Sequence, residues 1–149
     1  YSSDSFRAIG TAKYLAEKNK TKIKLDKRIN ERILGCDKIS SLPDNFTINS
    51  YKNKDLKFNN GESLNEVDKR FHNFINEIIN SNDNKIVLVI HGIILTSYLQ
   101  TICNFNFDGK TFKISFNNKE VINRRLTNPD VFKLEVNAGK IINIKNLEI

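Results

Sequence analysis

Hydrophobic positions in the first part of the chain follow helical spacing and then lose it. Apolar side chains recur every three or four positions over residues 3–19, which predicts a helix. Residues 22–25 alternate between basic and apolar side chains and predict a short strand, and residues 26–35 predict a turn or short irregular segment. Residues 36–61 are mixed and polar, so we expect a loop with room for one short helix.

The middle of the chain carries the strongest helical signal. Ser63 and Glu66 fit a capping box, in which each side chain satisfies a free backbone amide of the other residue. This box predicts the start of a helix, and apolar residues at helical spacing continue to residue 79. Residues 85–92, KIVLVIHG, form a mostly β-branched run that predicts a central strand buried on both faces.

The order of these elements indicates the fold class. Residues 93–103 predict a second apolar helix, so a helix, a buried strand and a helix follow one another, as in α/β domains with a parallel sheet. Residues 131–136 and 140–144 alternate on either side of a turn, which predicts an antiparallel hairpin. We therefore expect an α/β fold of three layers, α/β/α, with a mainly parallel sheet and this C-terminal antiparallel hairpin.

Length and composition fit a single domain. The chain has 149 residues, of which 39% are hydrophobic and 28% charged, and this is enough to form a buried core. No apolar run approaches the ~20 residues of a membrane span, and the first residues do not resemble a signal peptide. We expect a cytoplasmic protein with no membrane partner.

The chain is basic, with 24 Lys and Arg against 17 Asp and Glu and a formal net charge of +7. This balance favours anionic partners, such as phosphate esters or nucleic acids. The lysines are scattered and no aromatic residues are interleaved with a dense basic run, so we expect no nucleic acid partner. Cys36 and Cys103 lack the spacing of metal ligands, and we predict no metal and no cofactor.

Three residues could carry chemistry because of their positions. His91 ends the predicted central strand, where α/β proteins bind ligands, and its side chain can exchange protons near neutrality. Arg7 lies near the start of the first predicted helix, where a guanidinium and helix amides can bind one anion. Glu31 could act as a general acid if its pKa is raised. The ordinary alternatives are a core histidine, a surface arginine and a surface Glu-Arg pair.

Four sequence blocks in a fixed order are more specific than these single residues. They are SSDSFRAIGTA at residues 2–12, LDKRINERILG at residues 25–35, GESL at residues 61–64 and LVIHG at residues 88–92. In this order the chain resembles the histidine phosphatase superfamily, which is also called phosphoglycerate mutase-like. The resemblance covers nearly the whole chain, so we expect one histidine phosphatase-like domain over residues 1–149, with a phosphoglycerate mutase-like fold.

The resemblance implies a role for each site residue. Arg7 matches the arginine that grips the phosphoryl oxygens, and Glu31 matches the glutamate that protonates the leaving oxygen. His91 matches the second histidine of the family, which holds the phosphoryl group in the geometry for transfer. The backbone N–H of Gly92 or Ile93 would add another donor. Such chemistry needs alignment and positive charge more than a metal.

The family's nucleophile is a histidine in an Arg-His-Gly motif on the first strand, and this sequence contains no Arg-His-Gly. Residues 1–3 resemble the end of a strand, so we expect a chain that is incomplete at its N-terminus. It could be truncated or cleaved, lack a part outside this sequence, or be a degenerate relative, and we favour truncation. A sheet without a central strand would expose unpaired backbone groups, which favours a homodimer.

The implied function is hydrolysis of a small-molecule phosphate ester, a phosphomonoester, through a phosphohistidine intermediate, with little activity in these 149 residues alone. The runner-up is a phosphoglycerate-type phosphomutase, although the short segment 36–61 favours a phosphatase. A non-catalytic phosphate-binding relative is a second class, which the gene sequence upstream of Tyr1 would distinguish. A basic nucleic-acid binder is a third, and its affinity would fall linearly with salt on logarithmic axes.

Overall fold

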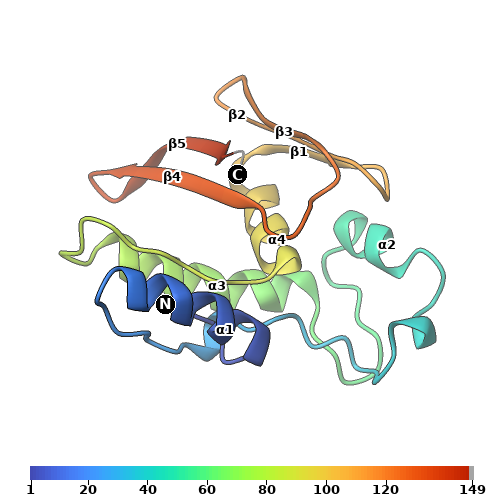
Figure 1. Ribbon diagram of the computed structural model, residues 1–149. Helices are drawn as coiled ribbons and strands as arrows, with labels where there is room; N and C mark the ends of the chain where they lie inside the picture. Colours follow the sequence, from blue (N-terminus) through green and yellow to red (C-terminus); the bar gives the residue numbers. More distant parts are fainter. Residues whose placement is uncertain (148–149) are drawn as a thin grey trace.

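The structure is a computed structural model that describes residues 1–147, with its helices on one side of two small antiparallel sheets (Figure 1). The helices lie mainly in the first two thirds of the chain, and the strands follow them. The helices are α1 (Phe6–Lys18), η1 (Lys27–Ile29), η2 (Ile39–Ser41), α2 (Phe46–Lys52), α3 (Leu64–Ile79) and α4 (Gly92–Ile102), of which η1 and η2 are 3-10 helices. The strands are β1 (Asn104–Phe107), β2 (Phe112–Phe116), β3 (Lys119–Arg124), β4 (Val131–Asn137) and β5 (Lys140–Leu147).

The helices predicted from the sequence are confirmed. Helices α1, α3 and α4 match the three predicted spans to within three residues at either end, and α2 is the short helix expected inside segment 36–61. The capping box of α3 is present in both directions. Ser63 Oγ accepts the Glu66 N–H at 3.2 Å, and Glu66 Oε2 accepts the Ser63 N–H at 2.8 Å.

The C-terminal hairpin is also confirmed. Strands β4 and β5 pair antiparallel and are joined by Ala138 and Gly139, which have φ angles of 48° and 71°. Two successive positive φ angles match the right-handed twist of the strands, and glycine adopts such an angle without strain. Leu134 and Ile144 are opposite each other in the register, and Ile144 is 3% exposed.

The mainly parallel sheet is not what the structure shows. All five named strands pair antiparallel, and within residues 1–147 parallel pairing is limited to bridges of Ser2 with Leu25 and with Val89. Residues 1–3 lie between the other two segments and can pair with only one or two residues on each side. The apolar run at residues 85–90 is therefore extended but forms only one bridge, and Val87 is 60% exposed instead of buried. The predicted strand at residues 22–25 is likewise reduced to one bridge at Leu25.

A three-stranded meander between α4 and β4 was not predicted from the sequence. Strands β1, β2 and β3 lie in that order, with Phe105 opposite Ile114 and Ile114 opposite Ile122. The β2–β3 turn contains Asn117 and Asn118 with φ angles of 50° and 60°. Asparagine tolerates this conformation, so the pair Asn-Asn between alternating residues was the available signal.

Two hydrophobic clusters hold these elements together. The first joins α3 to α4 and η1, and the second lies between α4 and the sheets. Helix α4 contributes to both clusters and so connects the helical part to the strands. The most buried members of the first are Ile29, Val67, Phe71, Phe74 and Ile94, and those of the second are Leu64, Leu99, Ile114 and Ile144.

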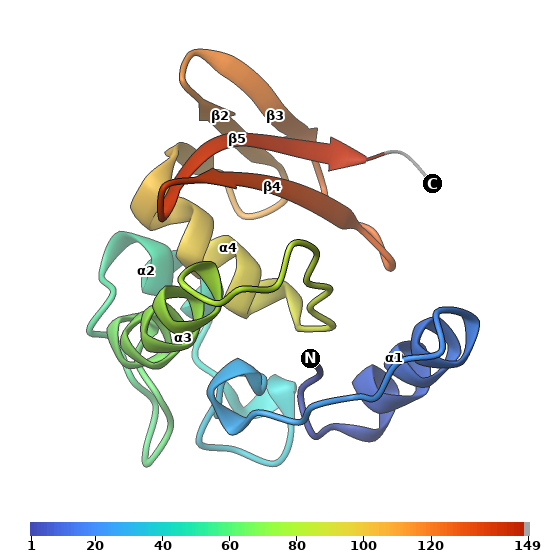
Figure 2. The ribbon, with the colours of Figure 1, turned by 90° about the vertical axis from the view of Figure 1, so that its left-hand side faces the viewer.

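Helix α1 lies at the edge of the molecule. Figure 2 shows it apart from α3 and α4, on the far side of the chain start. The side chains that it buries are small, namely Ala8, Ala12 and Ala16, whereas Phe6 is 95% exposed.

Among residues 1–147 no helix is long and apolar enough to cross a membrane.

Candidate active site

His91 joins the extended segment 85–90 to α4. It is the N-cap residue of this helix, with φ −115° and ψ 157°, and only 7% of its surface is exposed. Because α4 is anchored in both hydrophobic clusters, the ring of His91 is held at a fixed place. The sequence predicted this position, at the end of an apolar segment and the start of a helix.

Arg7 reaches His91 from the first turn of α1. Its Nη2 lies 2.9 Å from His91 Nδ1, and 68% of its side chain is exposed. A guanidinium can only donate, so Nδ1 accepts and the proton of the neutral ring is on Nε2. Nε2 in turn lies 2.8 Å from Ser3 Oγ and 3.3 Å from Ser5 Oγ. Ser3 is fully buried, and its hydroxyl holds the Nε2 side of the ring in place.

Glu31 completes this group. Its Oε2 lies 3.7 Å from Arg7 Nη2 and 3.7 Å from His91 Nδ1, and its Oε1 accepts the Arg32 N–H at 3.0 Å. Glu31 follows η1 in an irregular segment, so regular secondary structure does not fix its position. The structure thus brings together Arg7, Glu31 and His91, which the sequence analysis selected.

Burial shifts the pKa values of the two titratable groups in opposite directions. Desolvation lowers the pKa of His91, and the positive charges of Arg7 and Arg70 lower it further. Desolvation raises the pKa of Glu31, while the hydrogen bond from Arg32 and the charges of Arg7 and Arg70 oppose that rise. An acid with a raised pKa beside a histidine with a lowered one is an arrangement that favours proton transfer.

The first amides of α4 follow His91 directly in the chain. The first helical hydrogen bond runs from the Leu95 N–H to the His91 carbonyl at 3.1 Å, so the earlier amides of α4 have no helical acceptor. Gly92 and Ile93, the two residues whose amides the sequence analysis named as donors, are among them. A Cβ added at Gly92 would meet nothing within 4 Å, so a ligand can approach this backbone closely.

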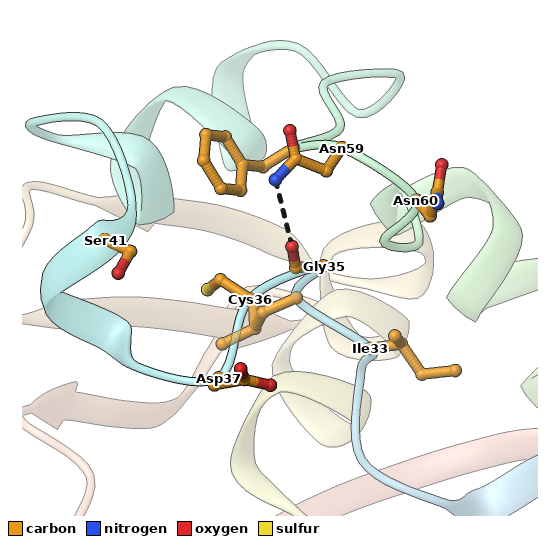
Figure 3. Close-up of a pocket in the computed structure, with 9 residues that line it drawn as sticks. Ile33, Gly35, Cys36, Asp37, Ser41, Asn59 and Asn60 are labelled. Carbon is orange, nitrogen blue, oxygen red and sulfur yellow. Dashed lines mark hydrogen bonds between the residues drawn. The ribbon is translucent and has the colours of Figure 1, made fainter.

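A hollow of about 820 Å³ lies further along the segment that carries Glu31 (Figure 3). Polar side chains and apolar surface are mixed in its lining, which consists of Ile33, Leu34, Gly35, Cys36, Asp37, Ser41, Phe58, Asn59 and Asn60. Asn59 Nδ2 donates to the Gly35 carbonyl at 3.2 Å across it. None of the residues selected from the sequence lines this hollow, and the sequence analysis did not predict it.

The sequence analysis also missed charged residues that support the site. Arg32 is 5% exposed and donates to Ser50 Oγ, at 3.0 Å, and to the Leu56 and Glu62 carbonyls. These bonds fix segment 36–61 against the segment of Glu31. Arg70 is held by Glu62 and is close enough to influence both titratable groups of the site. Within residues 1–147, no three His, Cys, Asp or Glu side chains are grouped as a metal site.

Comparison with protein families identifies the chain. Residues 1–134 match the histidine phosphatase superfamily, branch 1. The chain belongs to this superfamily. The family predicted from the four sequence blocks is therefore confirmed. Among curated proteins no sequence matches the chain.

Solved structures of similar fold include members with phosphatase names. A structure named mycobacterial hydrolase 1 has a TM-score of 0.59 and 23% identity over 68% of this chain and 56% of that one. Mycobacterial hydrolase 2 has a TM-score of 0.56 at the same identity, and the chain spans 50% of its length. A mycobacterial glucosyl-3-phosphoglycerate phosphatase with inorganic phosphate has a TM-score of 0.60 and 18% identity over 79% of this chain and 75% of that one. At these identities the likeness establishes the fold.

Proposed function

We propose that this chain is part of a phosphomonoester phosphatase of the histidine phosphatase superfamily. The enzyme would act on a small-molecule phosphate ester through a phosphohistidine intermediate. The observation that carries the proposal is the convergence of Arg7, Glu31 and His91 from three distant segments within 3.7 Å of one another. Family membership and fold neighbours with phosphatase names support the same reaction.

Binding of the phosphoryl group would use the donors around His91. The exposed guanidinium of Arg7 and the first amides of α4 can donate to its oxygens, and the helix dipole adds positive potential. When Arg7 turns from Nδ1 of His91 to the phosphate, Nδ1 can take up a proton from solvent and donate it in a hydrogen bond to a phosphoryl oxygen. These donors neutralise charge and align the group, which is most of what phosphoryl transfer requires.

Glu31 would handle the proton of the leaving group. Burial raises its pKa and so favours the protonated carboxyl, which can give its proton to the ester oxygen as the P–O bond breaks. The resulting carboxylate can then take a proton from the water that attacks the phosphohistidine. The cycle ends with free phosphate, the alcohol and a protonated Glu31.

The nucleophile would be a histidine outside this sequence. The 149 residues contain no Arg-His-Gly, and the second histidine of the chain, His72, is bonded to Asp68 on the same helix. Ser3 is close to His91, and with Glu31 it resembles a Ser-His-Glu triad, but it is fully buried. A buried hydroxyl cannot reach a substrate, so a serine nucleophile is not part of the proposal.

Two alternatives within the superfamily make different predictions. A phosphomutase of the phosphoglycerate type would return the phosphoryl group to an acceptor alcohol instead of water. A phosphate-binding relative without turnover is favoured by one specific observation, the lack of Arg-His-Gly in these residues. Both alternatives keep the anion site and differ only in the fate of the phosphoryl group once it is bound.

The test compares the 149-residue chain with the complete product of its gene on p-nitrophenyl phosphate. We expect turnover by the gene product with a ³²P-labelled, acid-labile intermediate, and loss of turnover in His91→Ala. His72→Ala is the matched control and should keep turnover. Phosphate binding without turnover in the gene product would support the non-catalytic relative, and phosphoryl transfer to an added alcohol in place of hydrolysis would support the mutase.

A further inference from the structure

The segment that carries Glu31 depends on side chains for its backbone hydrogen bonds. Between the end of η1 and residue 35 the chain forms no helix or strand, yet Glu31 must stay at the site. Backbone groups of a part-buried segment need partners, and where no ladder is present side chains must supply them. Two charged side chains, Arg70 and Glu62, do so here.

Arg70 projects from α3 and forms hydrogen bonds with the backbone of this segment. Its Nη1 donates to the Arg28 carbonyl at 2.7 Å, and its Nη2 lies 3.4 Å from the Glu31 carbonyl. The same guanidinium donates from Nε and Nη2 to the two carboxylate oxygens of Glu62 at 2.8 and 2.9 Å. Such a fork has one geometry, so the direction of Arg70 is fixed by Glu62.

Glu62 holds the other side of the segment. Its Oε2 accepts the Ile33 N–H at 2.9 Å, and its own N–H donates to the Ile33 carbonyl at 2.7 Å. Next to it, Gly61 is so close to the segment that an added Cβ would lie 2.6 Å from the Leu34 carbonyl carbon. Glu31 is thus bracketed by Arg70 on its own carbonyl and by Glu62 two residues later.

Both members of the pair are shielded from water. The side chains of Arg70 and Glu62 are each 20% exposed, in contrast to the surface pair of Lys13 and Glu17, where exposure is 70% and 66%. A bidentate pair with little exposure holds its geometry better than a solvated one. Because α3 is anchored in the first hydrophobic cluster, the pair connects a rigid helix to an irregular segment.

We propose that Arg70 and Glu62 are positioning residues that hold the Glu31 carboxyl at the Arg7–His91 site. The inference rests on the proposed function in one respect, the reaction in which Glu31 acts as the acid. The geometry of the Arg70–Glu62 pair does not depend on the proposed function. Arg70 does not touch the site group itself in this arrangement; its bonds go to backbone carbonyls and to Glu62. Apart from its charge, which acts on the pKa values of Glu31 and His91 from a distance, Arg70 therefore affects the site through the position of Glu31.

The key variant is Arg70→Lys, which keeps the positive charge but loses the two parallel hydrogen bonds of the guanidinium to Glu62. Glu62→Gln is the second variant, because it keeps an acceptor for Ile33 and weakens only the pairing with Arg70. Arg28→Lys is the matched control: Arg28 also connects this segment to α3, through Glu77 at 2.7 Å, and Glu77 lies about two helical turns from Arg70.

The first measurement follows the Glu31 carboxyl of the 149-residue chain by ¹³C NMR titration. Desolvation is the largest cause of its raised pKa, so release of Glu31 towards water should lower the pKa towards the ordinary glutamate value. We expect this fall in Arg70→Lys and Glu62→Gln and no change in Arg28→Lys. A cooperative melting curve, recorded for each variant, serves as the check that the variant is folded. An unchanged Glu31 titration in both folded variants would overturn the proposal.

The second measurement uses the complete gene product and separates this inference from the proposed function. Arg70→Lys should lower kcat on an alkyl phosphate on the order of tenfold more than on p-nitrophenyl phosphate, because only the alkyl ester needs an acid. The extra loss should disappear in the Glu31→Gln background. Equal losses on both esters in an active enzyme would overturn the positioning role. A shifted Glu31 titration in a protein without turnover would support the positioning role and reject the phosphatase.

Discussion

Nη2 of Arg7 lies 2.9 Å from Nδ1 of His91, although 84 positions separate the two residues in the sequence. Arginine cannot accept a hydrogen bond, so the imidazole must be neutral, with its proton on Nε2 facing Ser3. The site therefore carries the charge of Arg7 without a second charge from His91. A phosphate dianion that displaces Arg7 from Nδ1 would also favour protonation of the ring.

The tautomer and the pKa of His91 are the first prediction. We expect ¹⁵N NMR to show the Nε2–H form and a pKa below the ordinary value of about 6.5, because burial and the charge of Arg7 disfavour the imidazolium. Arg7→Gln should raise this pKa, although part of the shift should remain because burial is the larger cause. Lys13→Gln, on the same helix, should leave it unchanged. An Nδ1–H tautomer in the wild type would contradict the hydrogen bond from Arg7.

Removal of one backbone donor is the second prediction. Gly92→Pro deletes the amide N–H at the first position of α4, where proline is well tolerated, and His91 already has angles that suit a residue before proline. Gly92→Ala is the matched control, since an added Cβ meets nothing within 4 Å. We expect orthovanadate to bind about 10-fold more weakly to the proline variant, as for loss of one hydrogen bond to a charged group. Equal affinity in both variants would remove this amide from the site.

The third prediction concerns the guanidinium. Arg7→Ala should weaken the binding of orthovanadate or phosphate on the order of 10- to 100-fold, because at least one charge-assisted hydrogen bond is lost. Calorimetric titration measures the dissociation constant. Lys13→Ala removes one positive charge from the same helix, away from the site, and shows how much of the loss is general electrostatics. A loss of the same size in both variants would argue against a specific contact.

Stability as a function of pH gives a fourth prediction, which does not need activity. The folded protein holds the Glu31 proton more tightly than the unfolded chain, because the pKa of Glu31 is raised in the fold. As the pH rises above the ordinary glutamate pKa of about 4.3, ionisation of Glu31 therefore lowers the free energy of unfolding. Glutamine is neutral at every pH. We expect Glu31→Gln to melt at a higher temperature than the wild type at pH 7, with the difference vanishing as the pH falls below 4.

The exposed Glu17 supplies the control for this experiment. Glu17→Gln, on the surface of α1, should show no such gain at pH 7. A melting temperature of Glu31→Gln below that of the wild type at pH 7 would mean that the attraction to Arg7 outweighs the cost of burial. That outcome would also weaken the case for Glu31 as an acid.

Local signals in the sequence determined the helices, the C-terminal hairpin and the family. Capping by Ser63 and Glu66, helical spacing in α3 and the alternation of β4 and β5 each act over a few residues, so they can be recognised without knowledge of the rest. The four ordered blocks added Arg7, Glu31 and His91 as a candidate group. Their order reflects one fold, which is why a pattern of short motifs could select residues far apart.

Tertiary structure alone decided how these residues meet and what holds them. The run at residues 85–90 was predicted to be a buried central strand, but pairing depends on its neighbours, and Ser2 forms only one bridge to this run, at Val89. No spacing rule connects Arg70 on α3 to Glu62 and to the carbonyls of Arg28 and Glu31, because that contact arises from packing of separate segments. Backbone hydrogen bonds in irregular segments are satisfied by whichever side chain the fold brings there, and the sequence does not encode that partner locally.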